Sequence, residues 1–200
     1  DRLGLLTPNF LAVHMTQLTD DEIDHCARTG VHVLHSPESN LKLASGLCPV
    51  QRLIDAGVNV ALGTDGAASN NDLDMIGEMR TAAFSGKLAG AQPDAAAVSA
   101  DTALEMATLG GARALGLDEI TGSIEPGKAA DLCAVDLDAI ETQPMFDPIA
   151  AVVYNASREQ VTDTWVAGRA LMRERGLTTL DEADLLKRAD AWAELLARYT

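Results

Sequence analysis

Short apolar runs alternate with amphipathic stretches along the first third of the chain. The runs at residues 10–13, 31–34 and 58–64 predict strands, because each is mostly apolar and stops abruptly at polar positions. The stretch after the first run predicts a helix, since Thr19 and Glu22 have the spacing of a capping box. Strand, helix, strand, helix, strand at this spacing predicts parallel strands joined by right-handed crossovers.

The segment between the second and third strands divides into a loop and a helix. Residues 36–49 are rich in Ser, Asn and Pro and predict a long polar loop. A helix is expected from Pro49 to Gly57, because proline suits a first helical turn and glycine suits a helix end. Downstream, apolar spacing predicts one helix over residues 73–86 and a second over residues 99–115.

Beyond residue 121, short apolar runs between glycines and prolines indicate a small β layer. Its expected strands are residues 130–135, 149–154 and 161–166, with a turn at Gly168. The last segment has six apolar residues on one helical face, which we expect to dock on the body of the protein. These residues are Leu185, Leu186, Ala189, Trp192, Leu196 and Tyr199.

Composition narrows the class of protein. The 200 residues are 47% hydrophobic and 22% charged, enough for one sizeable core, and no apolar stretch reaches the roughly 18 residues that cross a bilayer. A membrane is therefore not an expected partner. A formal net charge of -15 would repel a phosphate backbone, so nucleic acid is not an expected partner either. Three cysteines without CxxC spacing favour core thiols and a reducing, cytoplasmic location; they are Cys26, Cys48 and Cys133.

Polar side chains stand at the end of all three predicted strands, where His14, His35 and Asp65 occur. Because the carboxyl ends of parallel strands meet at the face where barrels place catalytic groups, we expect these side chains to converge. Asp65 offers a hard oxygen ligand or a proton acceptor, and His14 can bond to a metal-bound water. The alternative for each is an ordinary turn aspartate or structural histidine. We assign His25 and His32 such structural roles.

Three segments resemble the final strands of the amidohydrolase superfamily: LAVHMTQLTDDE around His14, HSPESNLKLASGLCPV from His35, and LGTDGAASNNDLDM around Asp65. Within that superfamily they are most similar to the 5′-methylthioadenosine/S-adenosylhomocysteine deaminases. The segment GSIEPGKAADL from Gly122 also resembles the point where such chains leave the barrel for a β-sandwich. The resemblance covers nearly the whole chain, and the pairing of SNLKLASG with GTDGAASNN is its most specific part.

The resemblance implies a fold class and a reaction. The fold is expected to be α/β, the C-terminal part of a (β/α)8 TIM-like barrel plus part of a small β-sandwich domain. Residues 1–120 are then the last strands and helices of the barrel, residues 121–175 the β-sandwich segment and residues 176–200 a C-terminal helix. The implied reaction is hydrolytic deamination of the 6-amino group of an adenosine derivative, with release of ammonia, at one divalent metal ion, usually Zn2+.

The same resemblance implies roles for individual residues. Asp65 matches the last-strand aspartate that ligates the metal, contacts the substrate and takes a proton from metal-bound water. His14 matches the histidine that orients and polarises the resulting hydroxide. Ser69 falls at a substrate-contact position, and His35 and Asn40 lie on a loop that lines the substrate pocket. A metal lowers the pKa of its bound water from about 16 towards 7, which makes hydroxide available at neutral pH.

The chain departs from the family at two motifs. It lacks the His-x-His pair of the first barrel strand and the His-x-x-Glu of the fifth, with its proton-shuttling glutamate. Asp65 alone cannot hold a zinc ion that needs three or four protein ligands. We therefore expect this chain to be the carboxyl-terminal half of a longer, homo-oligomeric enzyme. The alternatives are a guanine or oxidised-purine deaminase, a chlorotriazine hydrolase, and a non-catalytic subunit.

Overall fold

The computed structural model describes residues 2–198 and divides into two compact units. The first unit is Asp1–Lys128 with Leu137–Gln160, and the second is Ala129–Asp136 with Val161–Thr200. Residues 137–160, which lie inside the expected 121–175 segment, therefore fold with the first unit. The domain boundaries at residues 120 and 175 stay a prediction.

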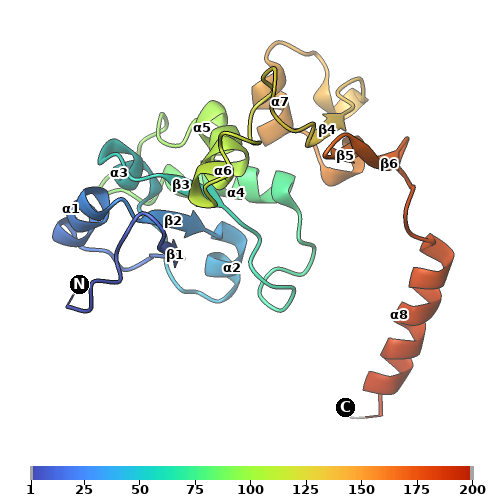
Figure 1. The fold of residues 1–200 in the computed structure, drawn as a ribbon, viewed down its shortest axis with the longest axis horizontal. Helices are drawn as coiled ribbons and strands as arrows, with labels where there is room; N and C mark the ends of the chain where they lie inside the picture. The colour runs from blue at the N-terminus through green and yellow to red at the C-terminus, as the bar shows by residue number, and fades with distance from the viewer. Residues whose placement is uncertain (1, 199–200) are drawn as a thin grey trace. The chain divides into compact units, whose positions relative to one another are not determined.

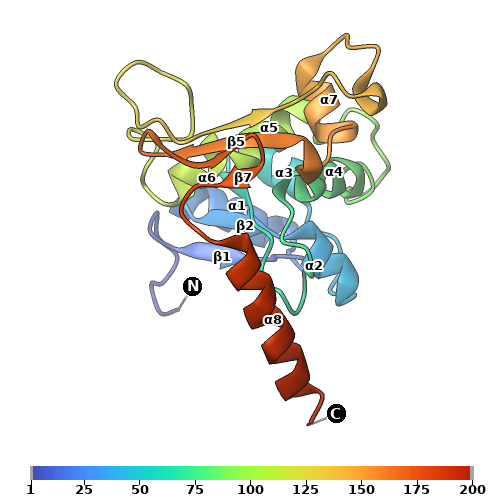
Figure 2. The same ribbon diagram turned by 90° about the vertical axis from the view of Figure 1, so that its right-hand side faces the viewer.

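Figures 1 and 2 show the elements in chain order. Those of the first unit are β1 (Leu11–Val13), α1 (Asp20–Thr29), β2 (His32–His35), α2 (Pro37–Lys42), α3 (Val50–Asp55), β3 (Val60–Leu62), α4 (Met75–Gly86), α5 (Ala100–Ala107), α6 (Leu109–Ala114), η1 (Ile140–Thr142), α7 (Pro148–Tyr154) and η2 (Arg158–Gln160). Those of the second unit are β4 (Leu132–Val135), β5 (Val161–Val166), β6 (Arg169–Arg173), β7 (Gly176–Leu177) and α8 (Glu182–Leu196).

The strands of the first unit form one parallel sheet in the order β1-β2-β3. The central strand pairs on both sides, so that Val33 lies beside Ala12 on one edge and beside Val60 on the other. All three side chains are buried, and Val33 has no exposed surface. The predicted parallel and adjacent arrangement of these strands is confirmed.

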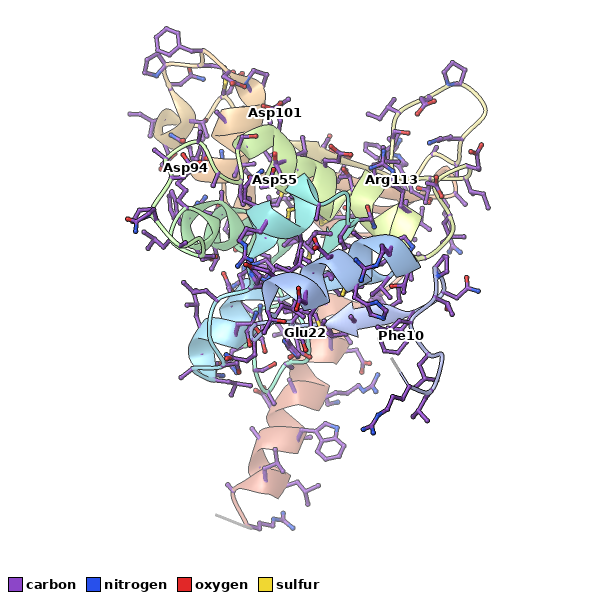
Figure 3. The ribbon with its side chains drawn as sticks, turned by 90° about the vertical axis from the view of Figure 1, so that its left-hand side faces the viewer. Phe10, Glu22, Asp55, Asp94, Asp101 and Arg113 are labelled. Atoms are coloured by element: carbon purple, nitrogen blue, oxygen red, sulfur yellow. The ribbon has the colours of Figure 1, made fainter. Side chains whose placement is uncertain are left out.

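Helix α1 begins and ends where local sequence signals place it. Thr19 accepts a hydrogen bond from the Glu22 N–H, and the Glu22 carboxylate accepts one from the Thr19 N–H, which completes the capping box. Gly30 ends the helix at φ 71°, in the left-handed region that favours glycine. Helices α1 and α3, marked by Glu22 and Asp55 in Figure 3, pack together on the same side of the sheet. A barrel has its helices on one side, whereas a doubly wound sheet has them on both.

The structure corrects the prediction of a loop throughout residues 36–49, because Pro37–Lys42 forms helix α2. Pro37 lies in the first turn, where a missing N–H costs nothing. The helix has no apolar stripe, and its inward face is polar, with Ser39 and Asn40 both buried. Apolar periodicity cannot detect a helix that buries hydroxyl and amide groups.

The predicted strand at residues 149–154 is wrong, because this segment is helix α7. The Asp147 side chain accepts hydrogen bonds from the first N–H groups of the helix, and Pro148 occupies its first turn. Tyr154 at its end stacks on Phe84 of α4, with ring centroids 5.6 Å apart. Capping and this packing outweigh the β-branched composition of the segment.

The helix predicted over residues 99–115 is divided into α5 and α6 at Thr108, whose φ and ψ are -124° and -93°. The break brings α6 close to β3. A methyl group added to Gly110 would lie 2.7 Å from the carbonyl oxygen of Val60, whereas one added to Gly111 would meet nothing within 4 Å. Glycine at position 110 is therefore what permits this contact between helix and strand.

Gly110→Ala is expected to lower the free energy of unfolding by about 1–3 kcal/mol, because backbone atoms on both sides would have to move. Its neighbour supplies the control. Gly111→Ala is expected to be neutral or stabilising by up to about 1 kcal/mol, since it removes a helical glycine in open space. Urea denaturation of the natural full-length polypeptide measures both. Equal effects of the two substitutions would contradict the close contact at Gly110.

The second unit is a four-stranded antiparallel sheet in the order β4-β5-β6-β7, followed by α8. Strands β4 and β5 fall on the predicted runs, and Gly168 with φ 76° lies in the turn between β5 and β6. Cys133 of β4 is exposed, so its prediction as a core thiol is wrong, whereas Cys26 and Cys48 are buried as expected.

Helix α8 carries the predicted apolar residues, but none of its residues is buried. Trp192 is 62% exposed and Leu186 is 69% exposed. No described part of the second unit covers this face, and the expected docking of the helix on the body of the protein stays a prediction; Tyr199 lies outside the described residues. Periodicity reveals an apolar face but not the surface that would cover it. Within residues 2–198, no helix is both long and apolar enough to cross a bilayer.

Candidate active site

Two of the predicted site residues have a backbone conformation that is uncommon for residues with a side chain. His14, just after β1, has φ 72°, and Asp65, just after β3, has φ 61°. Left-handed backbone at a residue other than glycine costs free energy and tends to occur at functional sites. At both positions it turns the chain sharply at the carboxyl end of a strand.

The side chains of these two residues meet across the end of the sheet. His14 Nε2 lies 3.8 Å from Asp65 Oδ2, although the residues follow the two outer strands. Their side chains are 40% and 35% exposed, so both are open to a ligand. A distance of 3.8 Å is too long for a direct hydrogen bond and suits a water molecule that bonds to both.

Asn40 of α2 orients the His14 ring. Its Oδ1 lies 2.8 Å from His14 Nδ1, and Asn40 itself is buried. An amide oxygen only accepts hydrogen bonds, so in this contact Nδ1 carries the proton. Nε2 faces Asp65; it is an acceptor when the ring is neutral and a donor when the ring is protonated. The contact fixes both the rotation and the tautomer of the ring.

Two hydroxyl groups hold Asp65 in its ionised form. Ser39 Oγ donates to Asp65 Oδ2 at 2.7 Å, and Ser69 Oγ donates to the same oxygen at 2.8 Å. These hydrogen bonds, first that of Ser39 and then that of Ser69, lower the pKa of the Asp65 carboxyl, and the Gly66 backbone and the charge of His14 act in the same direction. Asp65 is therefore ready to accept a proton or bind a cation at neutral pH.

His35, at the end of β2, is 2% exposed, and neither ring nitrogen has a hydrogen-bond partner among the described residues. Burial, and then the nearby charge of His14, lower the pKa of His35 to about 4. The ring is therefore neutral at physiological pH. The structure buries both His35 and Asn40, and their predicted contact with substrate stays a prediction.

Helix α2 also holds the loop that follows Asp65. Lys42 Nζ donates to the Ala68 carbonyl at 2.9 Å and to Asn71 Oδ1 at 2.5 Å. Ser69, on the same loop, is largely buried, and it lines an open hollow of about 310 Å³. The predicted role of Ser69 in substrate contact stays a prediction, while its bond to Asp65 is observed.

Sequence patterns did not identify Ser39 as a site residue. Its surroundings in the sequence predict a polar loop, whereas α2 puts Ser39 and Asn40 on the face that contacts Asp65 and His14. The pair Ser36-Pro37, which is typical of a helix start, is the signal that would have identified Ser39. A helix that starts there puts Ser39 and Asn40 next to each other on its surface. The two histidines assigned structural roles lie elsewhere: His25 is in α1, and His32 bonds to Asn59.

The residues present fit one part of a metal site. Asp65 offers an ionised, exposed carboxylate, which is a suitable oxygen ligand for a divalent cation. Among residues 2–198, no three His, Cys, Asp or Glu side chains are grouped so that they could hold a metal ion by themselves. The predicted role of Asp65 as a metal ligand stays a prediction.

Known proteins resemble this chain in sequence and in structure. A model of the amidohydrolase family matches residues 1–171. The chain is 50% identical over 194 residues to 5-methylthioadenosine/S-adenosylhomocysteine deaminase of Teredinibacter turnerae, a match that covers 97% of the chain and 43% of that protein.

Two solved structures extend the comparison. An adenosine deaminase from Xanthomonas campestris with bound zinc is 53% identical, with a TM-score of 0.95, and the match covers 99% of this chain and 45% of that one. A mutant atrazine chlorohydrolase from Arthrobacter aurescens, complexed with zinc and atraton, is 27% identical, with a TM-score of 0.88 and coverage of 95% and 42%. The chain spans less than half the length of each of these proteins.

Proposed function

The chain belongs to the amidohydrolase family, and from that premise we propose that it is part of a metal-dependent deaminase of 5′-methylthioadenosine or S-adenosylhomocysteine. The observation that carries the substrate class is 50% identity over 97% of the chain to a deaminase named for these compounds. The pairing of an ionised Asp65 with an oriented His14 at the strand ends supports the chemistry.

The proposal extends to the architecture. The parallel sheet of β1, β2 and β3 is proposed to be the last part of a (β/α)8 barrel, supported by its strand order and by the packing of α1 and α3 together on one side of it. The antiparallel sheet of the second unit is proposed to belong to a small β-sandwich. A homo-oligomeric, cytoplasmic enzyme with no nucleic acid partner is proposed for the complete protein, in keeping with the net charge of -15.

A zinc ion is the proposed cofactor, and Asp65 is its proposed ligand in this chain. When bound, such an ion lowers the pKa of a coordinated water molecule and so makes a nucleophile available near neutral pH. The low pKa of Asp65 favours this role, because the carboxylate binds a cation only in its ionised form.

The proposed roles of the side chains follow from their contacts. Asp65 accepts a proton from the attacking water, and His14, held by Asn40, orients that water through Nε2. Water adds its oxygen at C6 of the adenine ring, the proton that Asp65 has taken passes to the amino group, the C6–N bond breaks, and ammonia leaves. Ser69 is proposed to contact the substrate as well as Asp65, and His35 to form the neutral, buried floor of the site.

Turnover on a panel of substrates tests this function. The natural full-length polypeptide should release ammonia from 5′-methylthioadenosine and S-adenosylhomocysteine, with kcat/KM in the usual enzymatic range above about 10⁴ M⁻¹s⁻¹. Guanine and a chlorotriazine complete the panel. Faster conversion of either would assign the protein to one of the other activities in this superfamily, and inactivity on all four would contradict the proposal.

Ser39→Ala should shift the acid side of the pH–rate profile to higher pH. Removing the Ser39 hydroxyl takes away the largest influence that lowers the pKa of Asp65, so the carboxylate becomes protonated, and inactive as a base, at a higher pH than in the parent. The measurement is kcat/KM between about pH 4 and pH 8. Ser45→Ala, at the exposed end of the same segment, is the control and should keep the parent profile. An unchanged acid limb in Ser39→Ala would contradict this role.

A further inference from the structure

Helix α4 buries a carboxyl group that the proposed chemistry does not use. Glu78 has no exposed surface. Its Oε1 accepts a hydrogen bond from Asn70 Nδ2 at 2.5 Å, and its Oε2 lies 3.4 Å from the N–H of Glu38. In the described part of the chain, no basic side chain forms an ion pair with Glu78. Burying a carboxyl group without a cation costs free energy. The hydrogen bond from Asn70 is therefore the contact that has to compensate for the burial of Glu78.

Asn70 connects the loop after β3 to two helices. Besides its bond to Glu78 of α4, Nδ2 lies 3.3 Å from Oε2 of Glu38 in α2. Oδ1 accepts a hydrogen bond from the N–H of Leu73 at 3.0 Å, and the Asn70 N–H donates to the Gly66 carbonyl at 2.9 Å. With its N–H and both ends of its side-chain amide bonded, and with 2% exposure, Asn70 fixes the course of residues 66–73.

This loop carries one of the two hydroxyls that hold Asp65. Ser69 directly precedes Asn70, and its N–H donates to the same Gly66 carbonyl, at 3.0 Å. Its Oγ donates to Asp65 Oδ2 at 2.8 Å. A change at Glu78 therefore reaches Asp65 in two steps, through the side chain of Asn70 and then the backbone of the turn.

The protonation of Glu78 agrees with this arrangement. Burial raises the pKa of Glu78 to about 7, the charges of Glu38 and Asp72 raise it as well, and the hydrogen bonds from the Glu38 N–H and Asn70 oppose the rise. A large share of the molecules therefore has a neutral carboxyl at position 78 near neutral pH. Glutamine, which keeps a carbonyl oxygen of the same reach, imitates that neutral form.

We infer that Glu78 is a positioning residue: through Asn70 it fixes the 66–73 loop and so keeps the Ser69 hydroxyl on Asp65. The catalytic consequence rests on the proposed deaminase function. The order of the loop is a property of the protein without substrate, so the two can be tested separately.

The test compares Glu78→Leu with Glu78→Gln in the natural full-length polypeptide. Leucine removes the acceptor of the Asn70 amide, and we expect hydrogen exchange of the amides in residues 66–73 to rise, and turnover on methylthioadenosine to fall, by at least about tenfold each. Glutamine keeps the acceptor and should restore both to within about threefold of the parent. Asp101→Asn, an exposed carboxylate on α5, is the control and should change neither.

Each outcome decides between positioning and general stability. The inference is supported if hydrogen exchange becomes faster only in residues 66–73 and glutamine restores it. Any of three results would overturn it: faster exchange also in α1, unchanged exchange in the loop, or a Glu78→Gln variant as impaired as Glu78→Leu. If Glu78→Leu fails to fold, Asn70→Ala breaks the same bond from the loop side and should give the same local pattern. An inactive parent with the expected exchange pattern would refute the proposed deaminase function and leave the positioning of the loop intact.

Discussion

Asp65→Asn is expected to lower deaminase turnover by more than the roughly 10²- to 10⁴-fold that a positioned acid or base contributes. Asparagine keeps the size of the side chain and one oxygen, but it removes both the negative charge and the proton acceptor. Zinc content should fall as well, because the ionised carboxylate is the one cation ligand that we propose in this chain. Turnover on methylthioadenosine and zinc per polypeptide are the two measurements.

Asp55→Asn is a suitable control for this substitution. Asp55 lies at the end of α3, where its carboxylate accepts a hydrogen bond from Gln51 and has no contact with the site. It should keep full zinc and near-parent turnover. Full zinc and near-normal deamination in the Asp65→Asn protein would leave Asp65 as a strand-end turn residue and nothing more.

His14→Asn should separate metal binding from turnover. His14 bonds to Asn40 and faces Asp65 across 3.8 Å, and we propose that it orients the attacking water without ligating the metal. The variant is therefore expected to keep its zinc while turnover falls by about 10²- to 10⁴-fold. The shorter asparagine cannot place an acceptor where Nε2 stands.

The control for His14→Asn is His25→Asn in α1, which should leave both zinc and turnover close to those of the parent. Loss of zinc from the His14 variant would make His14 a metal ligand instead of an orienting residue. A double variant at His14 and Asp65 should be little worse than Asp65→Asn alone, because the two side chains act on the same water. Fully multiplicative losses would indicate independent roles.

The sequence by itself determined the elements whose signals are local. The apolar runs before His14, His35 and Asp65 are strands. Strands of a parallel sheet are buried on both faces, so their sequences are short and almost continuously apolar. Thr19 and Gly30 set the ends of α1 through hydrogen bonds within a few residues of each other. The order of strands and helices along the chain was enough to predict that the strand ends would open on one site.

Local patterns failed where a segment has no apolar face or has competing preferences. Helix α2 was expected to be a loop, because its inward side chains are a serine and an asparagine that are stable in the interior only with partners from distant strands. Segment 149–154 was expected to be a strand from its valines, although the Asp147 cap and the stacking of Tyr154 on Phe84 make it a helix.

The tertiary structure alone decided how the site residues act on one another. Sequence positions 14, 39, 40, 65 and 69 carry no indication that one serine hydroxyl lowers the pKa of Asp65 or that Asn40 fixes the tautomer of His14, because these contacts join residues 26 positions apart. The burial of Glu78 is likewise not indicated by the sequence. A glutamate on a helix is ordinarily solvated, and only the packing of α4 against α2 and the loop makes it a buried partner of Asn70. Hydrogen bonds and pKa values depend on which groups share a low-dielectric space, and that is set when distant segments pack together.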